Sequence, residues 1–431
     1  MTAATIVALA TGRPPAAIAV IRISGPDALA AAAALMSSPL PPPRRLSLRL
    51  LSDPADGTAL DSAMVAVFPG PATATGENVA ELHLHGGGAV ISGVLAALLA
   101  QPGMRLAEPG EFSRRAFASG RLDLAQVEGL ADLIAAETAT QRQQALALTS
   151  GVLSRTAEAW REHCLGILAE AEAGLDFAED ESDVAERLDE AARLQLQALV
   201  VEIEALISDS ARATRIRDGL TIAVTGPPNA GKSSIVNALA MRDAAIVTPV
   251  PGTTRDPIEV PIDLGGVAAM LVDTAGLRDT DDIVEAEGIR RARVRAADAD
   301  LVMHIVDTSP TTLPDDGILV VNKADLGSIA PHGAFHLSAT RGDGVADLRR
   351  YLVEWARSAT RPGEPALLAH ARHREAFSAA AAALSDAANC DDAVLRAESL
   401  RQAADAFGRI AGRIGVDDVL DRIFSRFCIG K

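Results

Sequence analysis

The feature that most restricts the fold of this chain is the octapeptide GPPNAGKS at residues 226–233. It follows the apolar segment LTIAVT and leads into SIVNALA, which has the composition of a helix. The pattern G-x-x-x-x-G-K-S between a strand and a helix is typical of a phosphate-binding loop, because its backbone N–H groups and the helix N-terminus attract anions. We expect Lys232 to reach the β- and γ-phosphates of a nucleotide and the Ser233 hydroxyl to bind Mg²⁺.

Two further motifs supply the remaining groups around the phosphates. PGTTRD at residues 251–256 offers Thr254 as a second hydroxyl ligand of Mg²⁺. DTAG at residues 273–276 follows an apolar segment, so Asp273 is expected to hold Mg²⁺ through water and Gly276 to donate its N–H to the γ-phosphate. These motifs predict a nucleoside triphosphate site.

Two more motifs select the base. NKAD at residues 322–325 follows an expected strand at 318–321, and SAT at residues 338–340 follows an expected strand at 335–337. The Asp325 carboxylate can accept hydrogen bonds from N1–H and the 2-amino group of guanine, which adenine lacks. The five motifs predict GTP contacts from Asn229, Ala230, Gly231, Lys232, Ser233, Ser234, Thr248, Thr253, Thr254, Asp273, Thr274, Ala275, Gly276, Asn322, Lys323, Asp325, Ser338 and Ala339.

The hydrolytic chemistry differs from that of Ras-like enzymes, which place Gln after the DxxG glycine. Here Leu277 occupies that position, so a carboxylate in the acidic segment 279–287 must orient water. A monovalent cation held by the Asn229 side chain and by backbone carbonyls around residues 248–253 can offset phosphate charge. Arg255 acting in cis is the alternative.

The hydrophobic pattern divides the chain into three kinds of segment. Residues 1–117 favour α/β structure, with strands expected at 17–24, 63–68 and 78–85 and a helix at 88–100. The pattern is helical from about 122 to 217, with a clear amphipathic helix at 188–207, alternates between strand and helix over 219–357, and becomes helical again after 363.

The simplest organisation is a helical domain made of both helical segments, with the α/β module inserted at surface loops. We expect domains at 1–118, at 119–217 together with 361–431, and at 218–360. The fold class is therefore multidomain α/β plus α.

Charge and composition limit the partners. The formal net charge is −17, so any RNA contact must be local or shared with a partner protein. Only three lysines occur, and two of them, Lys232 and Lys323, stand in nucleotide motifs. Three widely spaced cysteines indicate a reducing cytosol, and the absence of a run of about 20 apolar residues argues against a membrane span. His83 and His85 alternate without a third ligand, which favours a role other than metal binding.

Four segments outside the nucleotide motifs carry a family resemblance. They are VIRISG at 20–25, TGENVAELHLHGGG at 75–88, PGEFSRRAFASGRLDLAQ at 109–126 and FCIGK at 427–431. Together with GTTRD they resemble the MnmE (TrmE) family across essentially the whole chain. The resemblance implies a folate-binding, dimerising N-terminal α/β domain, a discontinuous helical domain, and an inserted Ras-like P-loop GTPase domain stimulated by K⁺.

The resemblance also implies roles for particular residues. The Mg²⁺ ligands would be Ser233 and Thr254, and Glu285 would be the catalytic residue that acts on water through a relay. The K⁺ positions would be Asn229, Thr248, Val250 and Thr253. A 5-formyl- or methylene-tetrahydrofolate would be bound by Arg22, Glu81, Arg121 and Lys431, and Cys428 matches the family's C-terminal motif.

The reaction implied is the formation of aminomethyl or carboxymethylaminomethyl groups at C5 of the tRNA wobble uridine, in the cytoplasm. It would require a homodimer and an MnmG (GidA)-type FAD protein, which together form a heterotetramer. Arg121 stands where lysine is common in the family, which changes donor geometry without changing charge. A GTP-switched assembly factor for ribosomes or cofactors is the alternative; FCIGK and the folate-type N-terminus favour the first interpretation.

Overall fold

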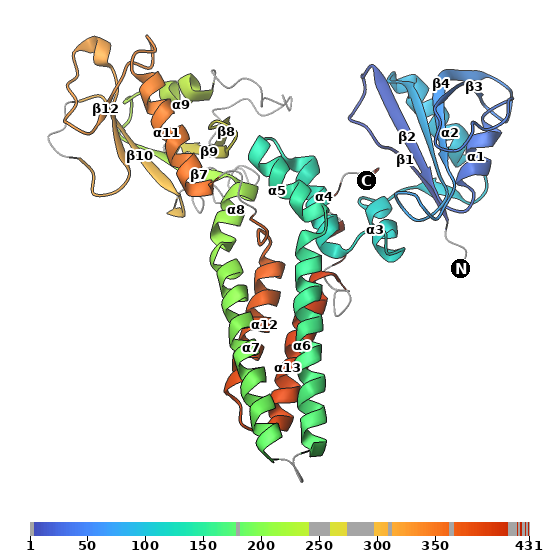
Figure 1. The fold of residues 1–431 in the computed structure, drawn as a ribbon. Coiled ribbons are helices and arrows are strands. Elements are labelled where there is room, and N and C mark those ends of the chain that lie inside the picture. The colour runs from blue at the N-terminus through green and yellow to red at the C-terminus, as the bar shows by residue number, and fades with distance from the viewer. Residues whose placement is uncertain are drawn as a thin grey trace, which may run out of the picture. The chain divides into compact units, whose positions relative to one another are not determined.

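The computed structural model describes residues 4–177, 182–240, 259–273, 297–308, 313–361 and 366–412, together with 420, 423, 424, 427 and 430 (Figure 1). The chain forms two compact units. One holds Met1–Ala131, Thr149–Arg161 and Phe407–Lys431, and the other holds Asp132–Leu148 and Glu162–Ala406. Each unit therefore combines segments that are distant in the sequence, and the chain is a multidomain α/β plus α protein.

The first unit contains a six-stranded sheet in the order β3-β4-β5-β2-β1-β6. Its strands are β1 (Thr5–Leu9), β2 (Ile18–Ser24), β3 (Ser47–Ser52), β4 (Ala59–Phe68), β5 (Val79–His85) and β6 (Met104–Leu106). Neighbouring strands are antiparallel except β1 and β6, which are parallel. The predicted strands at 17–24, 63–68 and 78–85 are confirmed as β2, β4 and β5, although β4 begins four residues earlier than expected.

Two helices cover one face of this sheet. They are α1 (Ala28–Ala34) and α2 (Gly88–Leu99), the second of which confirms the helix predicted at 88–100. Val94 and Leu98 of α2 belong to the same buried cluster as Ile21 and Leu82 of the sheet. Because strand side chains alternate between faces, the residues next to Ile21 and Leu82 in the sequence point to the opposite face.

The segment between the two sheets and the segment after the second sheet are helical. They include the helices α3 (Glu111–Ala118), α4 (Leu124–Ala135), α5 (Ala139–Thr149), α6 (Val152–Phe177), α7 (Ser182–Ser208), α8 (Ser210–Asp218), α12 (Ala371–Asn389) and α13 (Ala393–Ile410). The amphipathic helix predicted at 188–207 is confirmed within α7. Helix α7 packs along α12, where Arg193 donates to the carbonyl of Ala388 at 3.2 Å, and His163 of α6 lies 3.2 Å from Gln195 of α7. None of the described helices is long and apolar enough to cross a membrane.

The second unit contains another six-stranded sheet, in the order β12-β11-β10-β7-β9-β8. Its strands are β7 (Leu220–Thr225), β8 (Glu259–Asp263), β9 (Ala268–Asp273), β10 (Leu301–Val306), β11 (Ile318–Val321) and β12 (Phe335–His336). All neighbours are parallel except β8 and β9. The carboxyl ends of the parallel strands therefore lie at one edge, where ligands bind in open α/β sheets.

Two helices pack against this sheet, α9 (Lys232–Ala240) and α11 (Val345–Thr360). Ile235 and Leu239 of α9 and Leu348 and Leu352 of α11 are buried in one core with the central strands. The predicted alternation of strands and helices over 219–357 is thus confirmed for the described residues, and the core fixes the ends of the strands that carry the nucleotide motifs.

Candidate nucleotide site

The phosphate-binding loop joins β7 to α9 directly. Gly226 has φ +141°, and a Cβ added there would lie 1.9 Å from the carbonyl oxygen of Ile305, so only glycine fits. The Lys232 side chain is buried, and its Nζ donates to the carbonyl oxygens of Gly226 at 2.9 Å and Pro227 at 2.8 Å. The ammonium group is therefore held inside the loop, where it can meet phosphate oxygens together with the N-terminus of α9.

A hydroxyl and a carboxylate meet beside this loop. Parallel pairing places Asp273 opposite Val224, and Asp273 Oδ2 accepts a long hydrogen bond of 3.5 Å from Ser233 Oγ. Both groups are hard oxygen donors of the kind that Mg²⁺ prefers. The donor set fits a magnesium ion that retains water ligands. Among the described residues, no group of three or more His, Cys, Asp or Glu side chains is arranged to hold a metal by itself.

Asn322 ties the phosphate loop to the base-recognition loop. Its buried amide donates through Nδ2 to the carbonyl of Ala230 at 2.9 Å and accepts through Oδ1 from the N–H of Ala339 at 3.1 Å. The fit is close, because a Cβ at Gly231 would lie 2.2 Å from Asn322 Nδ2. One side chain therefore sets the spacing between the two loops.

The groups expected to face guanine lie on the same loops. A hydrogen bond from the Ser338 side chain lowers the pKa of Asp325, which keeps this carboxylate ionised as an acceptor. Lys323 has a left-handed backbone, with φ 60°, and its Nζ lies 2.5 Å from Asp307 Oδ2. Asp307 directly follows β10 and was not predicted; its signal in the sequence is a carboxylate at the end of an apolar strand.

The structure thus brings together the predicted residues Ala230, Gly231, Lys232, Ser233, Asp273, Asn322, Lys323, Asp325, Ser338 and Ala339. Asn229 lies in the phosphate loop with φ 63°, and Ser234 is exposed in the first turn of α9. The remaining predicted positions of this site lie outside the described residues: Thr248, Val250, Thr253, Thr254, Thr274, Ala275, Gly276 and Glu285.

A second polar cluster lies on the face of the first sheet that is opposite α1 and α2, which we call the open face. Arg22 and Glu81 are paired across β2 and β5, and Arg22 Nε and Nη2 donate to Glu81 Oε1 at 3.0 and 2.9 Å. The Arg22 guanidinium also lies 5.9 Å from the centre of the Phe112 ring. Arg121 Nε donates to the carbonyl of Thr73 at 3.0 Å. Lys431 and Cys428 lie outside the described residues.

Sequence reasoning missed a buried ionic network behind this cluster. Glu111 is buried and lies 2.5 Å from Arg105 Nη2 and 2.9 Å from Arg115 Nη2. Arg115 also donates to Glu77 at 3.0 Å, and Glu77 accepts from Ser24 at 2.9 Å. Burial raises the pKa of Glu111, but hydrogen bonds from Arg105, the Glu108 N–H and Arg115 outweigh it, and the pKa falls to about 2.

The histidines of the open face have acidic neighbours. His85 Nδ1 lies 2.7 Å from Asp61 Oδ1, and His83 Nε2 lies 3.6 Å from Glu81 Oε2. Each imidazole thus has one carboxylate beside it, and among the described residues neither pair belongs to a group of three or more His, Cys, Asp or Glu that could hold a metal.

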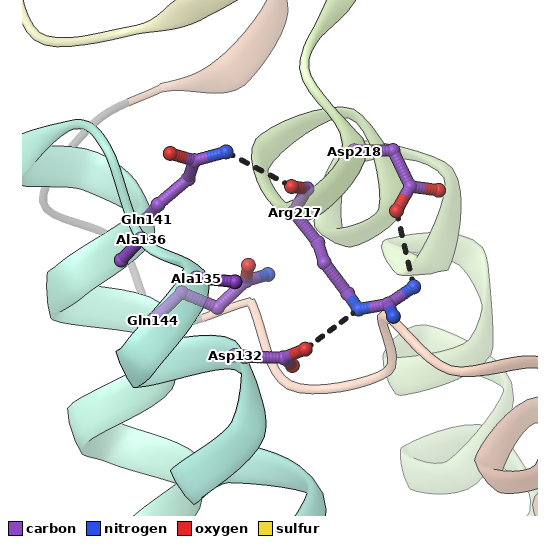
Figure 2. A pocket seen from close by; sticks show the side chains of 7 residues that line it. All are labelled: Asp132, Ala135, Ala136, Gln141, Gln144, Arg217 and Asp218. Atoms are coloured by element: carbon purple, nitrogen blue, oxygen red, sulfur yellow. Dashed lines mark hydrogen bonds and ion pairs between the residues drawn. The ribbon is translucent and has the colours of Figure 1, made fainter. Parts of the chain in front are cut away.

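A cluster in the second unit holds α8, the helix that leads into β7. Figure 2 shows Arg217 reaching toward Asp132 at the end of α4, with Nε 2.9 Å from Asp132 Oδ1. The other oxygen of Asp132 lies 2.8 Å from His370 Nε2. Gln141 donates to the carbonyl of Arg217 at 3.0 Å, and Gln144 donates to the carbonyl of Ala213 at 2.9 Å. We call Asp132, Gln141, Gln144, Arg217 and His370 the α8 clasp; most of it lines a cavity of about 230 Å³.

Comparison with known proteins places these features in a family. A family model described as the MnmE helical domain matches residues 124–428, and one described as the GTP-binding protein TrmE N-terminus matches residues 5–121. A protein of Azorhizobium caulinodans named tRNA modification GTPase MnmE is 49% identical over 436 residues, which cover 99% of each chain. A protein of Methylobacterium sp. (strain 4-46) with the same name is 51% identical, again over 99% of each chain.

Solved structures are similar over part of the chain. The G domain of the T. maritima FeoB iron transporter is 25% identical, with a TM-score of 0.21, and covers 32% of this chain and 98% of its own. The FeoB G domain of Methanococcus jannaschii is 24% identical, with a TM-score of 0.22, and covers 32% and 98%. At these TM-scores the likeness adds nothing to the features described above.

Proposed function

The chain belongs to the MnmE family of tRNA modification GTPases, and we propose that it works with an MnmG-type flavoprotein and a tetrahydrofolate one-carbon donor to modify the tRNA wobble uridine. The chain is a GTP hydrolase that acts in tRNA modification. The finer proposal is that it forms aminomethyl or carboxymethylaminomethyl groups at C5 of that uridine, as a homodimer in a heterotetramer with the flavoprotein, in the cytoplasm. The convergence of phosphate-binding and base-binding groups at one sheet edge supports GTP as the nucleotide, and family membership supports the tRNA part of the proposal.

The proposed domains follow from this function. Residues 1–118 form the folate-binding and dimerisation domain, residues 119–217 and 361–431 the helical domain, and residues 218–360 the inserted G domain. GTP hydrolysis in the inserted domain would drive its rearrangement, because nucleotide switches act through loops that contact the γ-phosphate.

The nucleotide would be bound by groups that already lie close together. Lys232 and the N-terminus of α9 would hold the β- and γ-phosphates, and Asp325 would accept hydrogen bonds from guanine N1–H and the 2-amino group. Asp325→Asn should weaken GTP binding and improve binding of xanthosine triphosphate, because an amide can donate to the 2-oxo group. Unchanged selectivity between the two nucleotides would contradict the role of Asp325.

Metal ions would be held at the edge of the phosphate loop. Ser233 and Thr254 would bind Mg²⁺, and Asn229 with Thr248, Val250 and Thr253 would bind K⁺. When bound, these ions neutralise charge that develops on the phosphates. GTP turnover is therefore expected to be faster in K⁺ than in Na⁺ buffer, and Asn229→Ala should remove the difference. Equal rates in both buffers for the unmodified protein would exclude the K⁺ site.

Glu285 is the proposed catalytic residue, because Leu277 has no group that can orient water. A carboxylate can accept a proton from a relay water that contacts the attacking water. Glu285→Ala should bind GTP almost normally and hydrolyse it far more slowly. Unimpaired hydrolysis would move the assignment to Asp282 or Glu287.

The folate donor would be bound on the open face of the first sheet. The Glu81 carboxylate can accept from pterin N–H groups, and Arg22, Arg121 and Lys431 can pair with carboxylates of the donor. The Arg22–Glu81 pair at 2.9 Å supports this proposal, because it holds a donor and an acceptor at fixed positions. Cys428 is proposed to be the functional cysteine of the family's C-terminal motif, FCIGK.

The decisive experiment measures the product in tRNA. The gene is deleted, and wobble uridines of bulk tRNA are analysed by mass spectrometry in the deletion strain and in the same strain with the gene restored. We expect the 5-substituted uridines to disappear and to return. Unchanged 5-substituted uridines would leave the assembly-factor alternative instead.

A further inference from the structure

A cavity in the first unit has not been assigned a role. It measures about 520 Å³ and lies where the turn between α3 and α4, the first two turns of α6 and the end of α13 meet. Phe117 and Leu122 give it apolar surface, and Asp123, Ser154, Arg155 and Glu158 give it polar groups. A cavity of this size, with apolar surface beside several converging polar groups, can accept a small molecule or a nucleoside.

Ser154 is the group that points to a ligand. Its residue is only 9% exposed, it lines the cavity, and its Oγ has no hydrogen-bond partner among the described residues. Serine and threonine within helices usually bond to the carbonyl of an earlier turn. Thr156, two residues later on α6, does so, donating to the carbonyl of Val152 at 3.1 Å. Leaving a buried hydroxyl without a partner costs free energy, so a ligand carbonyl that reaches the Ser154 hydroxyl would relieve this cost.

We propose that this cavity binds the uracil base of the tRNA nucleoside that is to be modified. The inference rests on the proposed function and names the subsite of the target base. RNA-binding proteins recognise single-stranded bases by stacking them on aromatic rings and by hydrogen bonds to their Watson–Crick edges. Phe117 supplies an aromatic ring, the Ser154 hydroxyl can donate to a uracil carbonyl, and the Asp123 or Glu158 carboxylate can accept from N3–H.

The charges of the lining favour a base over an anionic ligand. Two carboxylates line the cavity, and they oppose entry of a phosphate or of the glutamate end of a folate. Arg155 lines the cavity and is exposed. An exposed arginine at this position can pair with a backbone phosphate of the nucleotide while its base is inside. Cytosine lacks N3–H, so the carboxylates also favour uracil over cytosine.

Arg121 connects this cavity with the proposed folate site. Its Nε donates to the carbonyl of Thr73, in the loop that leads to β5 and Glu81. The segment that carries Arg121 therefore lines the cavity on one side and reaches the folate-binding loop on the other. This placement suits a base that receives a one-carbon unit.

The first test uses the full chain without a substitution. An anticodon stem–loop RNA with 4-thiouridine at the wobble position is irradiated with the protein, alone and with the flavoprotein partner, and cross-linked peptides are identified by mass spectrometry. We expect cross-links within residues 117–126 or 151–158. Cross-links confined to other segments, or no cross-link from an RNA that binds, would overturn the assignment of the cavity.

The second test compares Ser154→Ala with Thr156→Ala, a matched hydroxyl deletion outside the cavity. Both variants replace the gene in the deletion strain. Loss of one hydrogen bond to the base should lower the rate of wobble-uridine modification about threefold to tenfold for Ser154→Ala and not for Thr156→Ala. Equal modification by both variants would overturn the proposal. A lower melting temperature for Ser154→Ala would also overturn it, because the hydroxyl would then have a structural partner.

Failure of the proposed function gives a different result. If the deletion strain keeps its 5-substituted uridines and the RNA does not bind, the tRNA role itself is wrong. If those uridines depend on the chain but Ser154→Ala supports them fully, only the cavity assignment is wrong.

Discussion

Asn322 couples the two halves of the nucleotide site through a single buried amide. Asn322→Ala would leave the Ala230 carbonyl and the Ala339 N–H without this partner and would open space at Gly231. We expect a stability loss of about 1–3 kcal/mol and a clear loss of GTP affinity, because both loops would be free to move apart.

Differential scanning calorimetry and titration with a fluorescent GTP analogue would measure these effects. Asn389→Ala is the matched control, because the Asn389 amide is exposed and donates only to Ser385 on its own helix. GTP affinity in Asn322→Ala equal to that of the control would show that the loops keep their spacing without the amide.

The lowered pKa of Glu111 makes the free energy of unfolding depend on pH. Its pKa is about 2 in the folded protein and 4.5 in the unfolded reference state. Because the folded pKa is the lower one, the stabilisation is fully present above pH 4.5 and is lost as the pH falls toward 2. The difference between these two pKa values corresponds to about 3 kcal/mol of stability.

Glu111→Gln should therefore lower the melting temperature at pH 7 and much less at pH 3. Glu398→Gln serves as the control, because Glu398 pairs with Arg401 at 3.7 Å on an exposed helix surface, where such pairs contribute little. An equal loss at both pH values would mean that Glu111 acts through packing and not through its charge.

Residue-scale features were predictable where a local motif fixes them. The GPPNAGKS motif predicted the positions of Lys232 and Ser233, because a strand, a loop of fixed length and a helix leave little freedom. Glu111 and Ser154 were not predictable as buried groups, because their burial depends on segments far away in the sequence. The partner of Glu111 at Arg105 is close in sequence, but nothing in the pattern marks the pair as buried.

At the scale of elements, apolar runs that end in a motif were the easiest to predict. The strands at 318–321 and 335–337 were recognised from the motifs that follow them and appear as β11 and β12. The edge strands β3 and β6 were not predicted, because their leucines Leu48, Leu50 and Leu106 are exposed and each strand pairs with a single neighbouring strand. Pairing with a neighbouring strand, and not the local pattern, decides these elements.

Helix α8 leads directly into β7, so the α8 clasp sets how firmly the nucleotide-binding strand is held. Arg217→Gln removes the ion pair with Asp132 and keeps the helix propensity of α8. Because both partners are partly exposed, the expected loss of stability is small, about 1 kcal/mol or less.

The sharper measurement is hydrogen exchange. We expect faster amide exchange in α8 and at the start of α5 in Arg217→Gln, because the end of α8 would lose its ion pair and the backbone carbonyl of residue 217 would be held by Gln141 alone. Arg350→Gln is the control, because Arg350 pairs with Asp347 on the exposed surface of α11. Identical exchange in the two variants would show that the amides of Gln141 and Gln144 hold α8 without the ion pair.

At the scale of the whole molecule, each compact unit is assembled from segments that are distant in the sequence. The sequence predicts a discontinuous helical domain from its two helical stretches, but periodicity carries no information about which helices share a core. Contacts such as that between Trp160 and Phe407, whose ring centres are 6.0 Å apart, join segments that lie on either side of residues 218–360 in the sequence. Only tertiary structure specifies such pairs.

The net charge of −17 affects how the whole molecule approaches RNA. A strongly acidic protein repels RNA at long range, so an anticodon stem–loop bound at the proposed cavity would be held by a few local arginines, of which we name Arg155. Each phosphate contact to single-stranded RNA contributes about 0.7 to the slope of log affinity against log salt, so two or three contacts predict a slope of about −2. Arg155→Gln should make the slope less steep by about 0.7, whereas Arg350→Gln should leave the slope unchanged. A slope near −5 or steeper would require an extended basic surface, which a chain of this charge would have to borrow from its partner.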